Sequence, residues 1–405
     1  MIKVFNMKKL SVLSAGILLS CTFSSATAAQ NSITVWEDLN KAKGLEIAAK
    51  DFERDYDCKV LLVEKDSIKQ FKEVQKLSNN GMPVPDVFIL LSDKVGEAID
   101  KKVISDIPVM HTEKNRYLTS SVKDFIENNK IYAVPRSIES LVIFYNKDII
   151  KEPIETMSGY EILAKERQKE GKYGLIGKLN NLYYSYGFLS GYGSYIFGIN
   201  KDGTVNTDDI GLNNDGAVKG MKLVADYTRN YIPKTAIDKE NGLKTIDEMF
   251  INGQAAAVIN GPWAADKYKK AGVNYDVTSM PKLSNGMRVN PFCGNKGYAI
   301  SKKSKNKQLA AQFLVYANQP RYAMFRYQRT SELPPVKELL SNPLVLQDKL
   351  ATSISNQSVN TVSMPSVKKM NDVWKYMERA LNEAIADENA DVKAIADKAV
   401  QKIKD

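Results

Sequence analysis

The sequence has few of the residues on which metal sites and nucleophilic enzymes depend. Its 405 residues include a single histidine, His111, and three cysteines. A site with several histidine ligands is therefore impossible, and the cysteines are too few and too widely spaced for a zinc ribbon. No G-x-S-x-G stretch is present, so a Ser-His-Asp triad is not indicated. We expect no bound metal, no cofactor and no enzymatic activity.

Apolar runs long enough to span a membrane are also missing. Residues 1–29 instead have the order of a secretory leader: a lysine-bearing start, the short apolar stretch SVLSAGILLSCTF, and the small residues SSATAA. We predict cleavage after Ala29 and export to the periplasm. The alternative is lipoprotein processing, because Leu18-Leu19-Ser20-Cys21 resembles a lipobox and would place a lipid anchor on Cys21.

Stripes of basic and aromatic residues that would bind nucleic acid are absent as well. The formal net charge is +10, but acids and bases alternate, as in KDFERDYDCK at residues 50–59. This pattern predicts a solvated, lysine-rich surface and no nucleic-acid partner. The predicted mature chain keeps Cys58 and Cys293, both in apolar stretches. An exported protein can pair them, or both can stay buried as free thiols, and the sequence leaves this open.

What the sequence does contain is an alternation of strand and helix patterns. Strand-like runs occupy residues 32–37, 58–64 and 85–91. Between them, apolar residues recur at helical spacing over residues 45–52 and 67–77. This order predicts an α/β fold with a mostly parallel sheet and right-handed crossovers.

Later segments add strands, caps and turns. Residues 130–150 read as two β-rich runs separated by Pro135-Arg136, Asn214 is placed to cap a helix, and Asn285-Gly286 predicts a hairpin turn. No long linker divides the chain. If it has two domains, the chain must therefore cross between them more than once.

A tryptophan stands at an unusual corner in the stretch AAVINGPWAADKY, residues 256–268. The apolar run 255–259 ends in Asn-Gly turn chemistry, and Pro262 suits the first position of a helix. We therefore predict that Trp263 lies on the first turn of a helix just past a strand. From this position alone, its ring could belong to the core or to a binding surface.

Several segments together resemble the extracellular solute-binding proteins of ABC importers, most closely those that bind maltose and maltodextrins. They include ITVWEDLNKAKGL, MPVPDVFILLSDKVG, YNKDII, FINGQAAAVINGPW and MPSVKKMNDVWKYMERAL. The resemblance covers essentially the whole predicted mature chain. It implies a two-lobe periplasmic-binding-protein fold of type II, with a carbohydrate bound in the cleft between α/β lobes. It also implies a monomer that closes around its ligand and delivers it to a membrane permease.

Carried onto this chain, the resemblance implies specific boundaries. Lobe one would comprise residues 30–137 and 294–335, and lobe two would comprise residues 138–293 and 336–405. The lobes would be joined by several hinge crossings.

The resemblance also implies ligand contacts. Aromatic rings bury the C–H face of a sugar and leave its hydroxyls free for polar partners at the ring edges. The implied aromatic contacts are Trp263, Trp374, Tyr183 and Tyr184, whereas Trp36 matches a structural tryptophan. The implied polar contacts are Asn40, Lys41, Glu64, Asp93, Lys94 and Glu139.

Four positions depart from the pattern of the maltose binders. Leu90 stands where those proteins have a stacking tryptophan, Asn181 replaces a glutamate, Glu378 replaces an arginine, and Arg136 adds a cation beside the hinge. These departures leave a second hypothesis open, in which the same fold binds another disaccharide, a sugar phosphate or a polyamine. An exported glycosidase with Glu64 and Glu139 as acid and base is the alternative that the residues support least.

Overall fold

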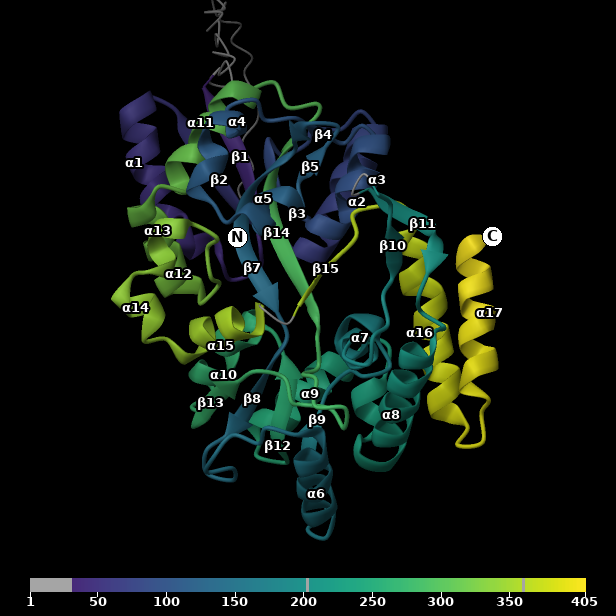
Figure 1. Cartoon of the computed structure of the whole chain (residues 1–405). Coiled ribbons are helices and arrows are strands. Elements are labelled where there is room, and N and C mark those ends of the chain that lie inside the picture. The colour runs from purple at the N-terminus through teal and green to yellow at the C-terminus, as the bar shows by residue number, and fades with distance from the viewer. Residues whose placement is uncertain (1–30, 202–203, 359–360) are drawn as a thin grey trace, which may run out of the picture.

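The computed structural model describes residues 31–201, 204–358 and 361–405, so the predicted leader and Cys21 lie outside the described residues. Within these ranges, no helix combines the length and the apolar character that crossing a membrane requires. The chain forms two separate main sheets, each covered by helices, one in the upper and one in the lower half of Figure 1.

The first sheet contains the strands predicted near the N-terminus. Its order is β15 (Val362–Ser363), β14 (Phe292–Ser301), β3 (Val87–Leu91), β1 (Ser32–Glu37) and β2 (Lys59–Glu64). The short β4 (Ile104–Ser105) and the longer β7 (Ala133–Ser140) also pair with β14. The predicted alternation of strands with helices is confirmed by α1 (Glu46–Tyr56) and α2 (Ser67–Asn79).

The parallel pairing expected for the first three strands is confirmed, and β15 also lies parallel to β14, but the other pairs of this sheet are antiparallel. β1 lies parallel to β2 and β3, but β14 lies antiparallel to β3, β4 and β7. The reason is tertiary: β7 and β14 run in opposite directions along the path between the two halves of the molecule (Figure 1). Local periodicity carries no information on that pairing.

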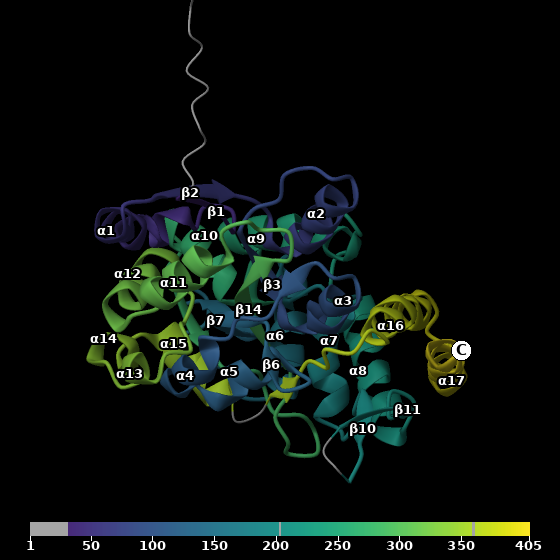
Figure 2. The same ribbon diagram turned by 90° about the horizontal axis from the view of Figure 1, so that it is seen from above.

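The second sheet has the order β13 (Tyr275–Thr278), β8 (Val142–Asn146), β12 (Ala255–Asn260) and β9 (Tyr173–Ile176). Apolar side chains of β8 and β12 pack with α7 (Leu182–Ser190), α8 (Asp215–Tyr231) and α16 (Met370–Ala386) in one cluster. Asn214 caps α8 as predicted, by accepting a hydrogen bond from the backbone of Ala217. In both views α16 and α17 (Val392–Lys404) lie together at one side of the molecule (Figures 1 and 2).

The remaining elements complete the two halves. Two hairpins are formed by β5 (Ile126–Glu127) with β6 (Lys130–Ile131) and by β10 (Phe197–Ile199) with β11 (Val205–Ile210). The other helices are α3 (Val95–Asp100), α4 (Met110–Glu113), α5 (Thr119–Lys123), α6 (Met157–Gln168), α9 (Gly242–Ile251), α10 (Ala265–Lys270), α11 (Lys307–Ala317), α12 (Pro320–Thr330), α13 (Lys337–Leu340), α14 (Pro343–Leu346) and α15 (Lys349–Ser358). Short 3-10 turns are η1 (Ala42–Gly44), η2 (Ser92–Lys94), η3 (Lys114–Arg116), η4 (Lys234–Ile237) and η5 (Pro262–Ala264).

Pro135-Arg136 does not separate two strands, contrary to the prediction. β7 continues through both residues and ends at Ser140. The pairing with β14 shifts here: Ser137 faces Lys296 and Pro135 faces Gly297, which leaves Arg136 as the extra residue of a bulge. A bulge tolerates proline, which has no N–H to donate, and it redirects the side chain of the extra residue.

Candidate functional site between the two sheets

Trp263 occupies the predicted corner. β12 ends at Asn260, Pro262 begins η5, and α10 follows directly, so the predicted order of strand, turn and helix is confirmed. The indole ring folds back over Gly261, where an added Cβ would lie 2.1 Å from the ring. Glycine is therefore required here by the close approach of its neighbour's ring.

A network of buried hydrogen bonds holds the same corner in place. The Asn260 side chain accepts from the Gly261 N–H (2.9 Å) and donates to Asp247 Oδ1 (3.0 Å). The Tyr268 hydroxyl also donates to Asp247 Oδ1 (2.6 Å). All three side chains are buried, so the position from which Trp263 projects is held by directional bonds.

Four rings from four elements form what we term the aromatic row: Trp263, Tyr183, Phe292 and Trp374. The Tyr183 ring lies 6.2 Å from the rings of both Trp263 and Phe292, and Phe292 lies 5.5 Å from Trp374. Phe292 is buried, whereas Trp263, Tyr183 and Trp374 are only partly buried. Tyr184 touches Tyr183 edge-on at 5.6 Å but is itself buried. Three predicted stacking residues therefore share one partly exposed surface.

Two predicted polar residues meet the end of this row. The Trp374 indole N–H donates to Asp93 Oδ2 (3.3 Å), and Lys94 Nζ lies 2.9 Å from the same oxygen. Lys94 also donates to Asn371 Oδ1 (3.0 Å), and Asn371 donates to Glu97 (3.0 Å). These bonds join the first turns of α16 to η2 and α3.

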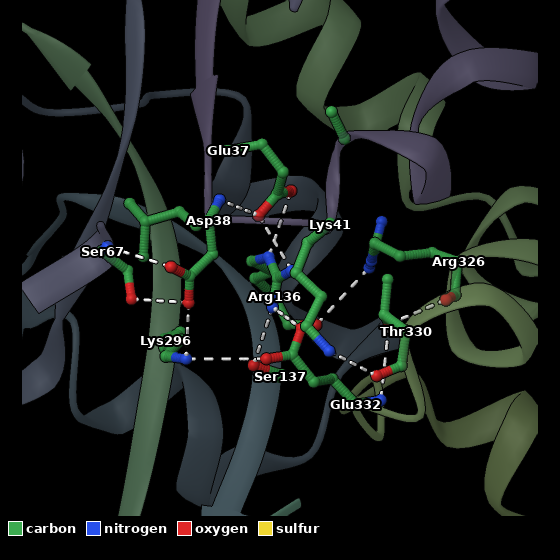
Figure 3. A network of polar contacts seen from close by, with 12 residues as sticks. Glu37, Asp38, Lys41, Ser67, Arg136, Ser137, Lys296, Arg326, Thr330 and Glu332 are labelled. Atoms are coloured by element: carbon green, nitrogen blue, oxygen red, sulfur yellow. Dashed lines mark hydrogen bonds and ion pairs between the residues drawn. The ribbon is translucent and has the colours of Figure 1, made fainter. Parts of the chain in front are cut away.

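Charged side chains gather where the strands of the first sheet end. We term the following set the charge cluster, most of which Figure 3 shows: Glu37, Asp38, Arg136, Glu139, Lys296 and Glu332. Lys296 Nζ lies 2.8 Å from Glu139 Oε1, 3.2 Å from Asp38 Oδ2 and 3.5 Å from Glu332 Oε1. Burial alone would lower the pKa of Lys296, but attraction to Glu139, Glu332 and Asp38 outweighs it and raises this pKa.

Arg136 is part of this cluster and does not face outward. It is 0 % exposed, with Nη2 2.9 Å from Glu37 Oε1 and Nη1 2.7 Å from Glu332 Oε2. The interpretation of Arg136 as an added cation for a charged solute is therefore wrong, because two buried carboxylates already neutralise it. The bulge in β7 explains how its side chain reaches them.

The other departures also have structural partners. Asn181 caps α7 and donates to Glu378 Oε2 (3.0 Å), so these two substitutions form one paired feature. Leu90 is fully buried beside Trp36 and Phe71, and it presents no face between the sheets. Trp36 is confirmed as a structural residue of the same cluster.

The remaining predicted residues lie at the ends of β1 and β2. Asn40 is exposed and has a left-handed backbone (φ 62°), while Glu64 is exposed and accepts from the Ala42 N–H (3.1 Å). Lys41 is buried, and its ammonium donates to the Thr330 carbonyl (2.9 Å). Among the described residues, no hydrogen bond, ion pair or ring contact joins these three side chains to the aromatic row.

Sequence reasoning missed Asp38, Phe292, Lys296 and Glu332. Asp38 carried a usable signal, because it directly follows a parallel strand, where ligand-facing groups of α/β sheets gather. Phe292 and Lys296 lie on one long strand without any motif. Their role depends on where β14 runs in space.

Both described cysteines are free thiols, so a Cys58–Cys293 disulfide is excluded. Burial raises the pKa of the Cys293 thiol to about 11. His111 is exposed on α4, and among the described residues no three histidine, cysteine or acidic side chains are grouped to hold a metal ion.

Comparison with known proteins agrees with this geometry. A family model described as "Bacterial extracellular solute-binding protein" matches residues 48–353. A galactooligosaccharide-binding protein of Bacillus subtilis is 34% identical over 394 residues, which cover 96% of this chain and 93% of that protein. A maltooligosaccharide ABC transporter solute-binding lipoprotein of Streptococcus pneumoniae is 32% identical over 388 residues, covering 94% of this chain and 90% of that protein.

Solved structures of sugar-binding proteins are also similar to this chain. MalX from Streptococcus pneumoniae, in complex with maltopentaose, has a TM-score of 0.85 and 31% identity, covering 92% of this chain and 99% of that one. Maltose-binding periplasmic protein MalE from Listeria monocytogenes, in complex with maltose, has a TM-score of 0.79 and 32% identity, covering 93% and 97% of the two chains.

Proposed function

Because this chain belongs to the bacterial extracellular solute-binding protein family, we propose that it is the exported binding component of an ABC importer. Its solute is an oligosaccharide, which it delivers to a membrane permease by closing two lobes around it. The names of the similar proteins support this proposal, because they bind malto- or galactooligosaccharides and one is named as part of an ABC transporter. Hinge closure biased by ligand contacts is a two-state mechanism that such a fold can perform.

The aromatic row is the single observation that carries the proposal. Trp263, Tyr183 and Trp374 are only partly buried, and ring contacts through Phe292 join them in one row. Asp93 lies at one end of this row, and Glu139 raises the pKa of Tyr183 by electrostatic interaction, after burial itself. Flat apolar faces flanked by strong acceptors match the C–H faces and hydroxyl edges of sugar rings.

The solute class follows from charge pairing around the row. Asp93 is paired with Lys94, and Glu139 with Lys296, so each of these two carboxylates already has a cation beside it. Carboxylates that are already paired act as hydrogen-bond acceptors for hydroxyl groups, which favours a neutral oligosaccharide over a polyamine or a sugar phosphate. We propose a maltooligosaccharide as the first candidate, and a galactooligosaccharide as the second because of the 34% identical relative.

The proposed lobes follow the two sheets. Residues 30–137 with 294–335 form lobe one, and residues 138–293 with 336–405 form lobe two. Leu333 packs in the cluster of the second sheet, whereas Val336 and Leu339 pack in the cluster of β1 and β3, so the segment that follows α12 contacts both proposed lobes. The absence of catalysis is also part of the proposal: Glu139 is held by buried Lys296 and Glu64 by a backbone amide, which suits binding better than acid–base chemistry.

Export by the leader at residues 1–29 is proposed with two processing routes. Cleavage after Ala29 gives a soluble mature chain, and a lipid anchor on Cys21 is supported by the relative that is named a lipoprotein. The intact mass of the mature protein distinguishes them, since the second route starts the chain at a lipid-modified Cys21. Retention of the leader would contradict both routes.

Titration of the purified mature chain tests the solute proposal. Maltotriose, maltose, a galactooligosaccharide, a sugar phosphate and a polyamine are added while tryptophan fluorescence is recorded. We expect a saturable change with an oligosaccharide that disappears in Trp263→Ala and persists in Trp36→Phe, because Trp36 is a core residue. Saturable binding of only the charged solutes would overturn the proposed solute class.

A further inference from the structure

Three of the segments that link the two sheets carry members of the charge cluster. β7 leads from the first sheet into β8 and carries Arg136, and β14 returns to the first sheet and carries Lys296. The third segment follows α12 and carries Glu332, and its Leu333 carbonyl accepts from the Ile138 N–H of β7 (2.9 Å). The places where the lobes would hinge are therefore joined by buried ion pairs.

Glu332 is the common partner of the two cations. It lies 2.7 Å from Arg136 and 3.5 Å from Lys296, and it is 1 % exposed. Its interactions with Arg136, Lys296 and Lys41 lower its pKa although burial opposes this, so it carries a negative charge. Figure 3 shows Glu332 placed between the side chains of Arg136 and Lys296.

Lys296 connects Glu332 to two further carboxylates of the charge cluster. Its ammonium lies against Glu139 Oε1 and Asp38 Oδ2. Glu139 pairs with Lys296 through Oε1, and its second oxygen, Oε2, takes no part in that ion pair. If Glu332 is neutralised, both Arg136 and Lys296 would attract the Glu139 carboxylate. Its side chain would then turn toward the protein interior.

We propose that Glu332 is a positioning residue for solute binding. By balancing Arg136 and Lys296, it fixes the three linking segments relative to one another and keeps Glu139 free to face the solute. This role rests on the proposed function, since it assumes an oligosaccharide between the sheets.

A double-mutant cycle with maltotriose separates this role from plain structural support. We expect Glu332→Gln to weaken binding by about tenfold, and to weaken it by less than about twofold when added to Lys296→Met. Asp276→Asn is the control, because Asp276 is another buried, lysine-paired carboxylate and lies on β13; the affinity of this variant should not change. Thermal unfolding of every variant checks that it is folded. Additive effects of the two substitutions on affinity would overturn the proposal.

A measurement without sugar keeps the proposal testable if the wild-type chain binds no oligosaccharide. In the ligand-free Glu332→Gln variant, hydrogen exchange should speed up by about tenfold in β7 and β14, whereas β1 and β2 should keep wild-type protection. In the Asp276→Asn variant, β7 and β14 should keep wild-type protection. Unchanged exchange in β7 and β14 would overturn the hinge role of Glu332. Failure of the wild type to bind any oligosaccharide would overturn the proposed function alone.

Discussion

The aromatic row and the charge cluster lie close to one another but are built by opposite rules. The row contains apolar rings that are only partly buried, such as those of Trp263 and Trp374. The cluster consists of charges that are buried although they could be solvated, as Arg136 and Glu332 are. Exposed rings add little to folding and are available for a ligand, whereas buried ion pairs must be complete for the fold to persist. Substitutions in the two regions should therefore separate stability from binding.

The largest expected effect is the loss of folding stability when the charge cluster is changed. Arg136→Met leaves Glu37 and Glu332 buried without their shared cation and should lower the free energy of unfolding by about 3–5 kcal/mol. Chemical denaturation with urea measures this. The control is Arg321→Met, which removes an exposed arginine paired with Asp51 and should change stability by less than about 1 kcal/mol. Equal losses in the two variants would contradict the distinction between the regions.

The next effect is on binding alone. Trp263→Ala should weaken oligosaccharide affinity by about 2 kcal/mol, or roughly thirtyfold, because a stacking face is lost. Its unfolding midpoint should stay near that of the wild type, since the ring is partly exposed. Calorimetric titration and denaturation of the same preparation give both values. A large loss of stability with normal affinity would return Trp263 to a core role.

A smaller effect tests how the row is held in place. Gly261→Ala forces the Trp263 ring off its present position and should weaken binding by about 1 kcal/mol, with a changed near-ultraviolet circular dichroism spectrum. Gly171→Ala is the control, because its Cβ meets nothing within 4 Å but its positive φ strains an alanine. The control should lose about 1 kcal/mol of stability without loss of affinity. Unchanged affinity in Gly261→Ala would show that the ring position does not matter.

The smallest effect concerns pH. Burial raises the pKa of Asp124 to about 6, although Asn295 donates to its Oδ2 at 2.6 Å. The folded state then binds this proton more tightly than the unfolded state, so the stability contribution of Asp124 falls as pH rises from about 4 to 6. Asp124→Asn removes this titration and should raise the melting temperature near pH 7 relative to the wild type, with no such gain near pH 4. If the melting temperatures of the two proteins change equally with pH between 4 and 7, the raised pKa of Asp124 is refuted.

Much of the local structure could be predicted because its causes are local. The alternation of residues 32–91, the Asn214 cap and the strand–turn–helix order around Trp263 all depend on side-chain spacing and backbone preference within a few residues. The segments quoted for the resemblance also sufficed to identify the family. The stacking role of Trp263, Tyr183 and Trp374 stays a prediction, although their rings do lie in one row.

What failed were inferences that needed a partner distant in sequence. Pro135-Arg136 looked like a strand break, and Arg136 like a free cation, because neither the bulge opposite Lys296 nor the two carboxylates at Glu37 and Glu332 can be inferred from neighbouring residues. Asn181 and Glu378 looked like separate departures until α7 and α16 brought them within a hydrogen bond.

The sequence by itself determined the elements, their caps, the family and the candidate rings, since these depend on short-range patterns. Only the tertiary structure decided that both cysteines stay free, that β14 lies antiparallel to β3, and that Lys296 stands among three carboxylates. The physical reason is that charge pairing and strand pairing are satisfied by whichever groups the folded chain brings together, and residues 37, 136, 296 and 332 meet only after the chain has passed to the second sheet and returned to the first.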